Sequence, residues 1–344
     1  MNHKMQKIDV LVIGAGISGL IAARKLKESG LHVIVVDKSS QIGGRLATEN
    51  IDSGLADLGA QFFTTRNSEF QNMVNEWTTA GIVYTWATSW STSSIEPHPS
   101  TERAPGHPRY AAHKGMNALA AYLAQGLEIF THCQIVSLTA GQSGWHAHDT
   151  NENIFNAQAV LITAPVPQSL LILKNGFTHL SPGEVADVEL IQYAPCLAAV
   201  FRTDKPLHLP EPGAIQRPEE RVPWIADNRR KGISPETNLV TVHASTELSK
   251  ELWKADDAQI LTVLEESLLP FLDADTLVQP ARLKRWQYAW PEVLYPKRYF
   301  LSSYLPPLIF AGDAFGGPRI EGAVLSGLAA SQVLSSLKNG KLSS

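Results

Sequence analysis

The sequence GAGISG at residues 14–19 constrains the fold of this chain more than any other feature. It follows the largely apolar run DVLVI at 9–13, which is rich in β-branched residues. It leads into a stretch with helical periodicity at 17–29, which Gly30 ends. A second β-branched run, at 33–36, leads into Asp37. Short apolar runs of this kind are typical of strands buried on both faces. The pattern therefore predicts a strand–helix–strand unit with a glycine-rich turn.

Each glycine of the turn has its own physical role. Gly14 permits the tight turn, Gly16 lets the backbone approach a pyrophosphate, and Gly19 lets the helix pack closely on the strand. The N-terminus of the helix supplies N–H groups and the positive end of a dipole to phosphates. Asp37, 18 residues beyond Gly19, is placed to accept hydrogen bonds from an adenosine ribose. The sequence therefore predicts a dinucleotide site, without distinguishing NAD from FAD.

Length, composition and charge exclude several classes of protein. The 344 residues favour about two domains, and 44% apolar against 18% charged residues argues for an extensive core. A net charge of −4 without long like-charged runs argues against nucleic-acid binding. Lys4 and Lys7 precede an apolar run, as in a secretory signal, but the glycine spacing argues against that interpretation. We expect no membrane span, because no apolar run approaches about 20 residues.

Cysteine and histidine patterns point to no metal and to a reducing compartment. Cys133 and Cys196 are too few for a disulfide framework, so we expect a cytoplasmic protein. His146 and His148 alternate on an expected strand but have no third ligand nearby in the sequence. We expect no metal, and the oligomeric state stays open.

The rest of the chain predicts alternating strands and helices in two domains. Expected helices cover residues 67–81, 115–125, 256–272 and 321–337, and expected strands cover 127–130, 134–138, 145–148, 159–163, 190–202, 239–244, 282–289 and 308–311. A loop rich in Ser, Thr and Pro is expected at 88–107. Because nucleotide-type signals lie at both ends, we expect a discontinuous cofactor domain at 1–80, 108–165 and 300–344, with a substrate domain at 81–107 and 166–299.

Two further glycine motifs fit a phosphate-rich ligand. In Gly43-Gly44-Arg45 the glycine pair lets the backbone lie against a ligand, and the arginine can pair with a phosphate. Near the other end, Gly312-Asp313 follows an apolar run, and a helix is expected to begin near Ile320. The positive end of that helix would favour a negatively charged group of the ligand.

These motifs together resemble the flavin-containing amine oxidase superfamily, and more narrowly its bacterial renalase branch. The resemblance rests on GAGISG, Asp37, GGR at 43–45, DLGAQFFTTR at 57–66, KGM at 114–116, TAP at 163–165, WIADNR at 224–229, HAS at 243–245, RWQYA at 285–289, and GD with GGPRIEGAVLSG at 312–327. They occur in family order over nearly the whole chain. The resemblance implies an α/β fold like that of p-hydroxybenzoate hydroxylase: a Rossmann-like FAD-binding domain and a mixed-sheet substrate domain.

The resemblance also implies which residues bind the cofactor. Besides the glycines Gly14, Gly16, Gly19, Gly44 and Gly312, the positions that match cofactor contacts are Ser18, Asp37, Lys38, Arg45, Gly59, Ala60, Asp313 and Ile320, with Ile135 or Val136 near the adenine. The cofactor implied is non-covalent FAD. No cysteine follows Cys196, so the C-terminal thioether to flavin found in some amine oxidases is not expected.

Substrate-facing positions follow in the same way. The resemblance places Gln61, Phe62, Phe63, Thr64, Thr65, Cys196 and Arg319 there, although Cys196 stands where the family has threonine. From the residues themselves, His243 either reaches the cavity or is a satisfied core histidine. Trp286 and Tyr288 alternate on an expected strand and fit either a cavity wall or core packing. Arg319 either binds an anionic substrate or pairs with Glu321.

The implied reaction requires no proton abstraction. Renalase-like enzymes oxidise the 2- and 6-dihydro isomers of NAD(P)H to NAD(P)⁺ and pass the electrons to O₂, giving H₂O₂. A dihydropyridine becomes an aromatic cation when it loses hydride, which suits a sequence with no recognisable nucleophile and base set. The alternatives are an amine oxidase or desaturase acting on a small amine, and a flavin-less chaperone like the GDP dissociation inhibitors.

Overall fold

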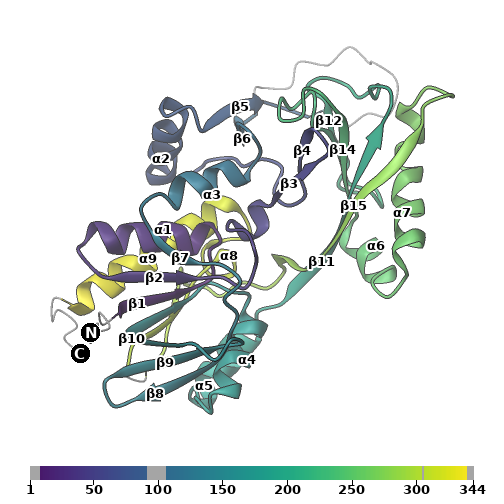
Figure 1. Ribbon diagram of the computed structural model, residues 1–344. Helices are drawn as coiled ribbons and strands as arrows, with labels where there is room; N and C mark the ends of the chain where they lie inside the picture. Colours follow the sequence, from purple (N-terminus) through teal and green to yellow (C-terminus); the bar gives the residue numbers. More distant parts are fainter. Residues whose placement is uncertain (1–7, 91–105, 304–305, 339–344) are drawn as a thin grey trace. The chain divides into compact units, whose positions relative to one another are not determined.

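A computed structural model describes residues 8–90, 106–303 and 306–338 of the chain (Figure 1). Most of the loop expected at 88–107 lies outside the described residues. The chain forms two compact units, which we call unit 1 (residues 1–44, 120–193 and 290–344) and unit 2 (residues 45–119 and 194–289). Compared with the domains expected from the sequence, this division assigns 45–80 and 108–119 to unit 2, and 166–193 and 290–299 to unit 1. The expected functional domains stay a prediction.

Unit 1 is built on a mixed sheet in the order β16-β17-β10-β1-β2-β7. Its strands are β1 (Ile8–Ile13), β2 (Val33–Val36), β7 (Glu128–Phe130), β8 (Ile135–Gly141), β9 (Gly144–Asp149), β10 (Ile154–Ile162), β16 (Phe300–Leu301) and β17 (Leu308–Phe310). The central strands β17, β10, β1, β2 and β7 are parallel, whereas β8, β9 and β16 join antiparallel. β1 and β2 are almost entirely buried, as their β-branched sequences predict.

Helices cover both faces of this sheet (Figure 1). They are α1 (Ile17–Glu28), α4 (Val166–Asn175), α5 (Pro182–Glu189), α8 (Asp313–Gly316) and α9 (Ile320–Lys338). α1 packs against α9, and α4 packs against β8. A Cβ at Gly327 of α9 would lie 2.4 Å from the Ser18 carbonyl oxygen, so only glycine allows this close helix contact.

The strand order of unit 1 creates a binding edge. From β1 the chain continues to β2 on one side, whereas β10 and β17 lie on the other, so the order reverses beside β1. In open α/β sheets, ligands bind at the carboxyl ends of the strands at such a reversal. Gly14, Asp37, Thr163 and Gly312 follow β1, β2, β10 and β17 within two residues, and because the strands are parallel all four lie at one edge. The expected α/β fold with a Rossmann-like unit is confirmed.

Unit 2 contains a sheet in the order β12-β13-β14-β11-β15 and two hairpins, β3-β4 and β5-β6. Its elements are β3 (Thr48–Ile51), β4 (Gly54–Asp57), α2 (Ser68–Thr79), β5 (Val83–Ala87), β6 (Arg109–Ala112), β12 (Ala214–Gln216), β13 (Trp224–Asp227), β14 (Asn238–His243), α6 (Thr246–Glu251), α7 (Asp257–Glu266) and the 3₁₀ turn η2 (Leu269–Phe271). The elements η1 (Gly44–Leu46), α3 (Asn117–Leu123), β11 (Tyr193–Thr203) and β15 (Val278–Pro291) cross the boundaries between the units.

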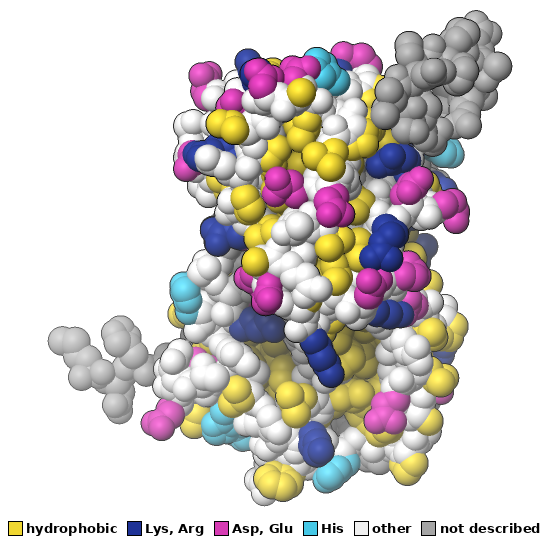
Figure 2. Space-filling model, turned by 90° about the vertical axis from the view of Figure 1, so that its right-hand side faces the viewer, with side chains coloured by type: hydrophobic (Ala, Val, Ile, Leu, Met, Phe, Trp, Pro, Cys, Tyr) yellow, Lys and Arg dark blue, Asp and Glu magenta, His cyan; other side chains and the backbone are white. Residues whose placement is uncertain are grey.

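Each of the two units has its own apolar core. In unit 2, one cluster joins β11, β14 and α7 through residues such as Phe201, Val240 and Leu264, all fully buried. On the face drawn in Figure 2, Lys and Arg side chains are interspersed with Asp and Glu, the pattern of a solvated surface. Within the described ranges, no helix is long and apolar enough to cross a bilayer.

Candidate cofactor and substrate sites

The glycine-rich turn after β1 has the geometry that its three glycines predict. Gly14 has a φ of +113°, and a Cβ on Gly19 would lie 2.0 Å from the Gly14 carbonyl oxygen. Thr163 braces the turn by donating its hydroxyl to the carbonyl oxygens of Ile13 and Gly14, at 3.2 and 3.0 Å. In contrast, a Cβ on Gly16 would meet none of the described atoms within 4 Å. The backbone at Gly16 is therefore open to a ligand.

The first turn of α1 carries a buried hydroxyl without a partner in the described structure. Gly16 is the N-cap of α1 and supplies no side chain to its first N–H groups. Ser18, in that turn, is only 5% exposed, and its Oγ makes no hydrogen bond to any described residue. Native structures rarely leave such groups unpaired. The Ser18 hydroxyl and the first N–H groups of α1 are therefore donors that would fit a pyrophosphate.

Asp37, directly after β2, helps to hold the glycine-rich turn. Its Oδ2 accepts from the Ala15 N–H at 2.7 Å, and its Oδ1 accepts from the Ser39 N–H at 2.8 Å. A carboxylate offers about four lone-pair sites, so both oxygens keep acceptor capacity. The Gly43 N–H donates to the Ala15 carbonyl at 2.7 Å, which lays the glycine pair along the same turn. Gly44 lies beyond it with a φ of +54°.

The glycines of the C-terminal motif pack closely against the start of α9. The Gly312 N–H donates to Ser326 Oγ at 2.8 Å, and Ser326 donates to the Arg298 carbonyl at 2.6 Å. A Cβ on Gly316 would lie 1.9 Å from the Gly322 carbonyl oxygen. Glycine is therefore required at position 316 by its packing against the start of α9. Asp313, only 8% exposed, begins α8 directly after this turn.

The remaining positions expected in unit 1 lie in different surroundings. Lys38 is exposed and donates to Gln168 Oε1 at 3.2 Å. Ile135 is buried in the core of unit 1, and the neighbouring Val136 is half-buried. Ile320 begins α9, as expected, and Arg319 immediately before it is exposed.

In unit 2, Gly59 and Ala60 pack on the backbone of Arg45. The Ala60 N–H donates to the Arg45 carbonyl at 2.8 Å, and a Cβ on Gly59 would lie 2.0 Å from the same oxygen. The Arg45 guanidinium donates to the Ala289 carbonyl at 3.1 Å. Gly59 is thus required by chain packing, and the cofactor roles of these three residues stay predictions.

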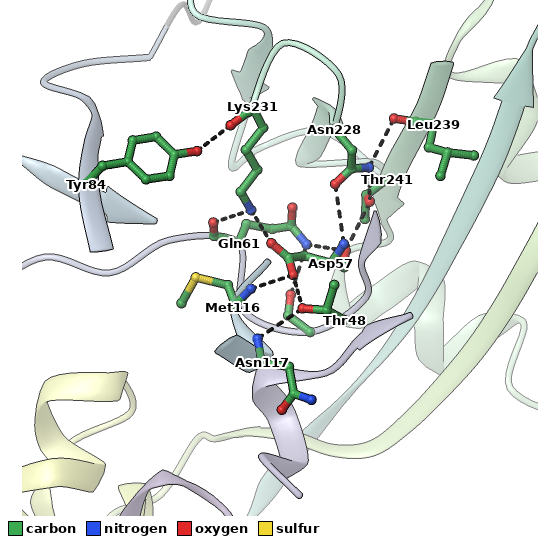
Figure 3. A network of polar contacts seen from close by, with 11 residues as sticks. Thr48, Asp57, Gln61, Tyr84, Met116, Asn117, Asn228, Lys231, Leu239 and Thr241 are labelled. Carbon is green, nitrogen blue, oxygen red and sulfur yellow. Dashed lines mark hydrogen bonds and ion pairs between the residues drawn. The ribbon is translucent and has the colours of Figure 1, made fainter. Parts of the chain in front are cut away.

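A fully buried ion pair, which the sequence analysis missed, organises the start of the DLGAQFFTTR segment (Figure 3). Lys231 Nζ lies 2.6 Å from Asp57 Oδ2, and both side chains are 0% exposed. The same ammonium donates to the Gln61 carbonyl at 2.6 Å and lies 4.8 Å from the Trp86 ring centre. Asp57 Oδ1 accepts from the Met116 N–H at 2.8 Å. All three ammonium N–H groups therefore have an acceptor or a ring face.

Further partners complete the network around Asp57. The Thr48 hydroxyl donates to the Asp57 carboxylate and accepts from the Asn117 N–H at 3.0 Å. The Asp57 carbonyl accepts from the Thr241 hydroxyl at 3.0 Å, and Asn228 Nδ2 donates to the Thr241 hydroxyl oxygen at 2.9 Å. Tyr84 donates to the Lys231 carbonyl. Nothing in the local sequence around Lys231 reveals the pairing, because Asp57 lies 174 residues away.

Gln61 is buried and oriented by this network. Its Nε2 donates to the Asp57 carbonyl at 2.6 Å and to the Gly59 carbonyl at 3.1 Å. Its Oε1 is buried and has no partner among the described residues.

The residues that follow Gln61 pack among aromatic side chains. Phe62 lies 5.1 Å from Trp90 and 5.4 Å from Trp224 between ring centres. Phe63 is buried against Phe70, Trp77 and Tyr110. Thr65 is buried and donates to Gln71, and Thr64 is half-buried. The substrate-facing roles of these four residues stay predictions, with Phe63 and Thr65 placed in the interior.

Cys196 and His243 lie in the sheet of unit 2. Cys196 is 3% exposed and burial raises the pKa of its thiol to about 12, so it is not a nucleophile at neutral pH. Burial lowers the pKa of His243 to about 4, and the positive charge of Lys231 adds to the shift. The ring hydrogen-bonds to the Leu58 backbone, but its Nε2 is buried without a partner in the described structure. His243 is thus a neutral histidine with one unused acceptor.

Trp286 and Tyr288 lie on β15, and both are half-buried. The Trp286 indole donates to the Leu58 carbonyl at 2.9 Å, and Lys284 Nζ lies 5.1 Å from its ring centre. Trp286 and His243 therefore both contact the backbone of Leu58. Whether either residue lines a substrate cavity stays a prediction.

The residues of unit 1 fit FAD on three observations. Gly16 is open, Ser18 offers an unused hydroxyl in the first turn of α1, and Asp37 keeps spare acceptor capacity. They would hold the pyrophosphate and the ribose, and Asp313 is placed by the last strand of the same edge. Within the described ranges, no three His, Cys, Asp or Glu side chains gather as metal ligands.

Curated relatives match only a small part of the chain. Putrescine oxidase of Kocuria rosea is 35% identical over 68 residues, which are 20% of this chain and 14% of that protein. Flavin-containing amine oxidase B of Homo sapiens is 37% identical over 71 residues, again 20% and 14%. The chain therefore aligns with about a seventh of the length of these relatives.

Solved structures are similar over nearly the whole chain. Wild-type putrescine oxidase bound to putrescine is 14% identical with a TM-score of 0.69, covering 96% of this chain and 99% of that one. An oxidoreductase from Methanosarcina mazei is 14% identical with a TM-score of 0.64, covering 94% and 100%. At such low identity, these neighbours establish the fold alone.

Two family models match the sequence. The NAD(P)-binding Rossmann-like domain matches residues 12–77, and the flavin containing amine oxidoreductase family matches residues 77–335, most of the chain. The cofactor of the protein is FAD, and the protein belongs to the flavin containing amine oxidoreductase family.

Proposed function

We propose that the protein is a renalase-like oxidase that takes hydride from the 2- and 6-dihydro isomers of NAD(P)H, releasing NAD(P)⁺, and uses O₂ as the acceptor to give H₂O₂. Bound FAD would supply the two-electron chemistry. The contribution of the chain is to bind the dinucleotide, orient its ring and exclude water.

The observation that carries the proposal is the lack of a proton acceptor among the described residues expected to face the substrate. Of these residues, His243 is a weak base with a pKa near 4, and the Cys196 thiol has a pKa near 12. Lys231, which holds the Gln61 carbonyl, is itself paired with Asp57. An amine arrives as an ammonium ion, with a pKa of about 10, and must lose a proton before hydride can leave. A dihydropyridine loses hydride directly, so it needs no base.

A second candidate is oxidation of a small amine. The family match and the similarity to putrescine oxidases favour it. Bulk water would then have to accept the ammonium proton before binding. Because the chain belongs to a flavin-containing family, we set the flavin-less chaperone aside.

Anaerobic rapid mixing separates the two candidates. The purified protein is mixed without oxygen with 2-dihydro-NAD, 6-dihydro-NAD, ordinary NADH or putrescine, and the flavin absorbance is followed. We expect the two isomers to bleach the flavin quickly and yield NAD⁺, with equimolar H₂O₂ when oxygen is admitted. Rapid bleaching by putrescine and none by the isomers would overturn the proposal.

A further inference from the structure

One peptide group of the glycine-rich turn is held at both ends by residues that directly follow the two strands beside β1. The Gly14 carbonyl accepts from the Thr163 hydroxyl at 3.0 Å, and the Ala15 N–H donates to Asp37 Oδ2 at 2.7 Å. The carbonyl and the N–H belong to the same trans peptide unit, so they point in opposite directions. Thr163, after β10, and Asp37, after β2, therefore fix the plane of this peptide between them.

The next peptide group is fixed as well. The Ala15 carbonyl accepts from the Gly43 N–H at 2.7 Å, so the Gly16 N–H of the same unit points away from Gly43. A Cβ on Gly16 would meet none of the described atoms within 4 Å. In the first turn of α1, the buried Ser18 hydroxyl has no partner among the described residues. Two held peptides thus lead directly into the open backbone where the FAD pyrophosphate is expected.

The Thr163 hydroxyl occupies the space that two glycines of the motif leave free. A Cβ on Gly14 would lie 2.6 Å from Thr163 Oγ1, and a Cβ on Gly19 would lie 2.9 Å from the same atom. The hydroxyl also donates to the Ile13 carbonyl at 3.2 Å, so its single hydrogen is shared between two successive carbonyl oxygens. Because this hydroxyl lies against the first and the last glycine of the motif, it restrains the whole turn.

Thr163 is itself held by the sheet of unit 1. Its N–H donates to the Ile13 carbonyl at 2.8 Å, which continues the parallel pairing of β10 with β1 beyond Ile162. On its other side β10 pairs with β17. A ligand binds more tightly when the groups that receive it are ordered before it arrives, because binding then costs less conformational entropy. A hydroxyl fixed by a central strand can supply that order to the turn.

We propose that Thr163 is a positioning residue for FAD. Its hydroxyl orders the Gly14–Ala15 peptide, so that the Gly16 backbone and the first turn of α1 are set to receive the pyrophosphate. Thr163 acts through the turn rather than by contact with the cofactor. The inference concerns the cofactor, so it does not depend on which substrate the flavin oxidises.

The test compares variants of Thr163 in the holoenzyme. Thr163→Ala removes the hydroxyl and adds no atom that could clash, whereas Thr163→Ser keeps the hydroxyl. The dissociation constant of FAD is measured from the change in flavin fluorescence as the cofactor is released on dilution. We expect Thr163→Ala to raise this constant about 3- to 10-fold, the effect of one lost hydrogen bond, and Thr163→Ser to stay within about twofold of the wild type.

Thr178→Ala is the matched control. The Thr178 hydroxyl also donates to a backbone carbonyl of unit 1, that of Leu138 at 2.6 Å, and the side chain is half-buried like that of Thr163. Thr178 follows α4, and Leu138 lies on β8, so neither belongs to the glycine-rich turn. A purely structural role of Thr163 predicts the same effect in both alanine variants. We expect only Thr163→Ala to weaken FAD binding.

Three results would overturn the inference. They are an unchanged FAD affinity in Thr163→Ala, an equal loss of affinity in Thr178→Ala, and an affinity of Thr163→Ser as low as that of Thr163→Ala. If Thr163→Ala fails to fold, Thr163→Cys takes its place with the same expected loss, because a thiol is a weak donor of similar size.

Discussion

Replacing Lys231 by methionine should destabilise unit 2 severely. The substitution leaves the Asp57 carboxylate 0% exposed without a counter-charge, and removes the donor to the Gln61 carbonyl. Removing one partner of a buried ion pair costs about 3–5 kcal/mol of unfolding free energy. The Met116 N–H and the Thr48 hydroxyl still donate to Asp57, so we expect a loss within this range rather than above it. For a unit of this size, that corresponds to a fall in Tm of about 6–20 °C.

Thermal and urea unfolding, followed by circular dichroism, measure this effect. The double variant Asp57→Asn with Lys231→Met removes the unpaired charge and should regain part of the lost stability. Arg202→Met is the matched control, because the pair of Arg202 with Asp52 is about half exposed and should contribute less than about 1 kcal/mol. A loss below about 1 kcal/mol for Lys231→Met, or no recovery in the double variant, would refute the role assigned to the pair.

Three further predictions follow from burial and close approach. Gly19→Ala should lower the Tm of the FAD-free protein, because a Cβ has no room there, whereas Gly16→Ala should leave that Tm unchanged and weaken FAD binding. Calorimetric titration with FAD measures the affinity, and an unchanged affinity in Gly16→Ala would count against the site. The pKa of His243 is about 4 in the folded state and about 6.5 in the unfolded state, so the unfolded state binds more protons between these pH values. The free energy of unfolding should therefore fall by at most about 3 kcal/mol as the pH drops from 6.5 to 4. His243→Leu should flatten this pH dependence in Tm measurements. Burial raises the thiol pKa of both Cys133 and Cys196 to about 12, so iodoacetamide at pH 8 should alkylate neither until urea unfolds the chain, as mass spectrometry would report.

The elements that were predicted well are those in which the local sequence pattern and the surrounding structure favour the same conformation. The strand expected at 33–36 is β2, and the helix expected at 17–29 is α1, ending one residue earlier at Glu28. Gly30 has a φ of +77°, the left-handed conformation that follows many helices. The helix expected at 67–81 is α2, and Asn67 caps it by accepting from the Phe70 N–H. In these segments periodicity, caps and burial all favour one structure.

The elements that the sequence analysis missed depend on exceptions to local sequence rules or on contacts with residues far away in the sequence. Helix α4 was not expected from the sequence, and it begins at Val166 between two prolines, because proline is tolerated in the first turn of a helix. The helix expected at 256–272 ends at Glu266, and the turn η2 around Pro270 follows. The β3-β4 hairpin is short and polar, so it shows no clear alternation.

The candidate site likewise contains some residues that could be predicted from the sequence and others that could not. The glycine turn and Asp37 were predictable because the spacing itself carries the geometry. Lys231 was not, since a lysine in the polar run NRRKG is usually exposed, and only the fold brings it to Asp57.

The long separation between Asp57 and Lys231 has a consequence for synthesis on the ribosome. The carboxylate emerges 174 residues before the ammonium that neutralises it. At about 5–20 residues per second, the nascent chain carries that acid unmatched for roughly 9–35 s. Unit 2 therefore cannot complete its interior during early translation, and a fragment that stops before residue 231 should be a substrate for chaperones or proteases rather than a stable intermediate.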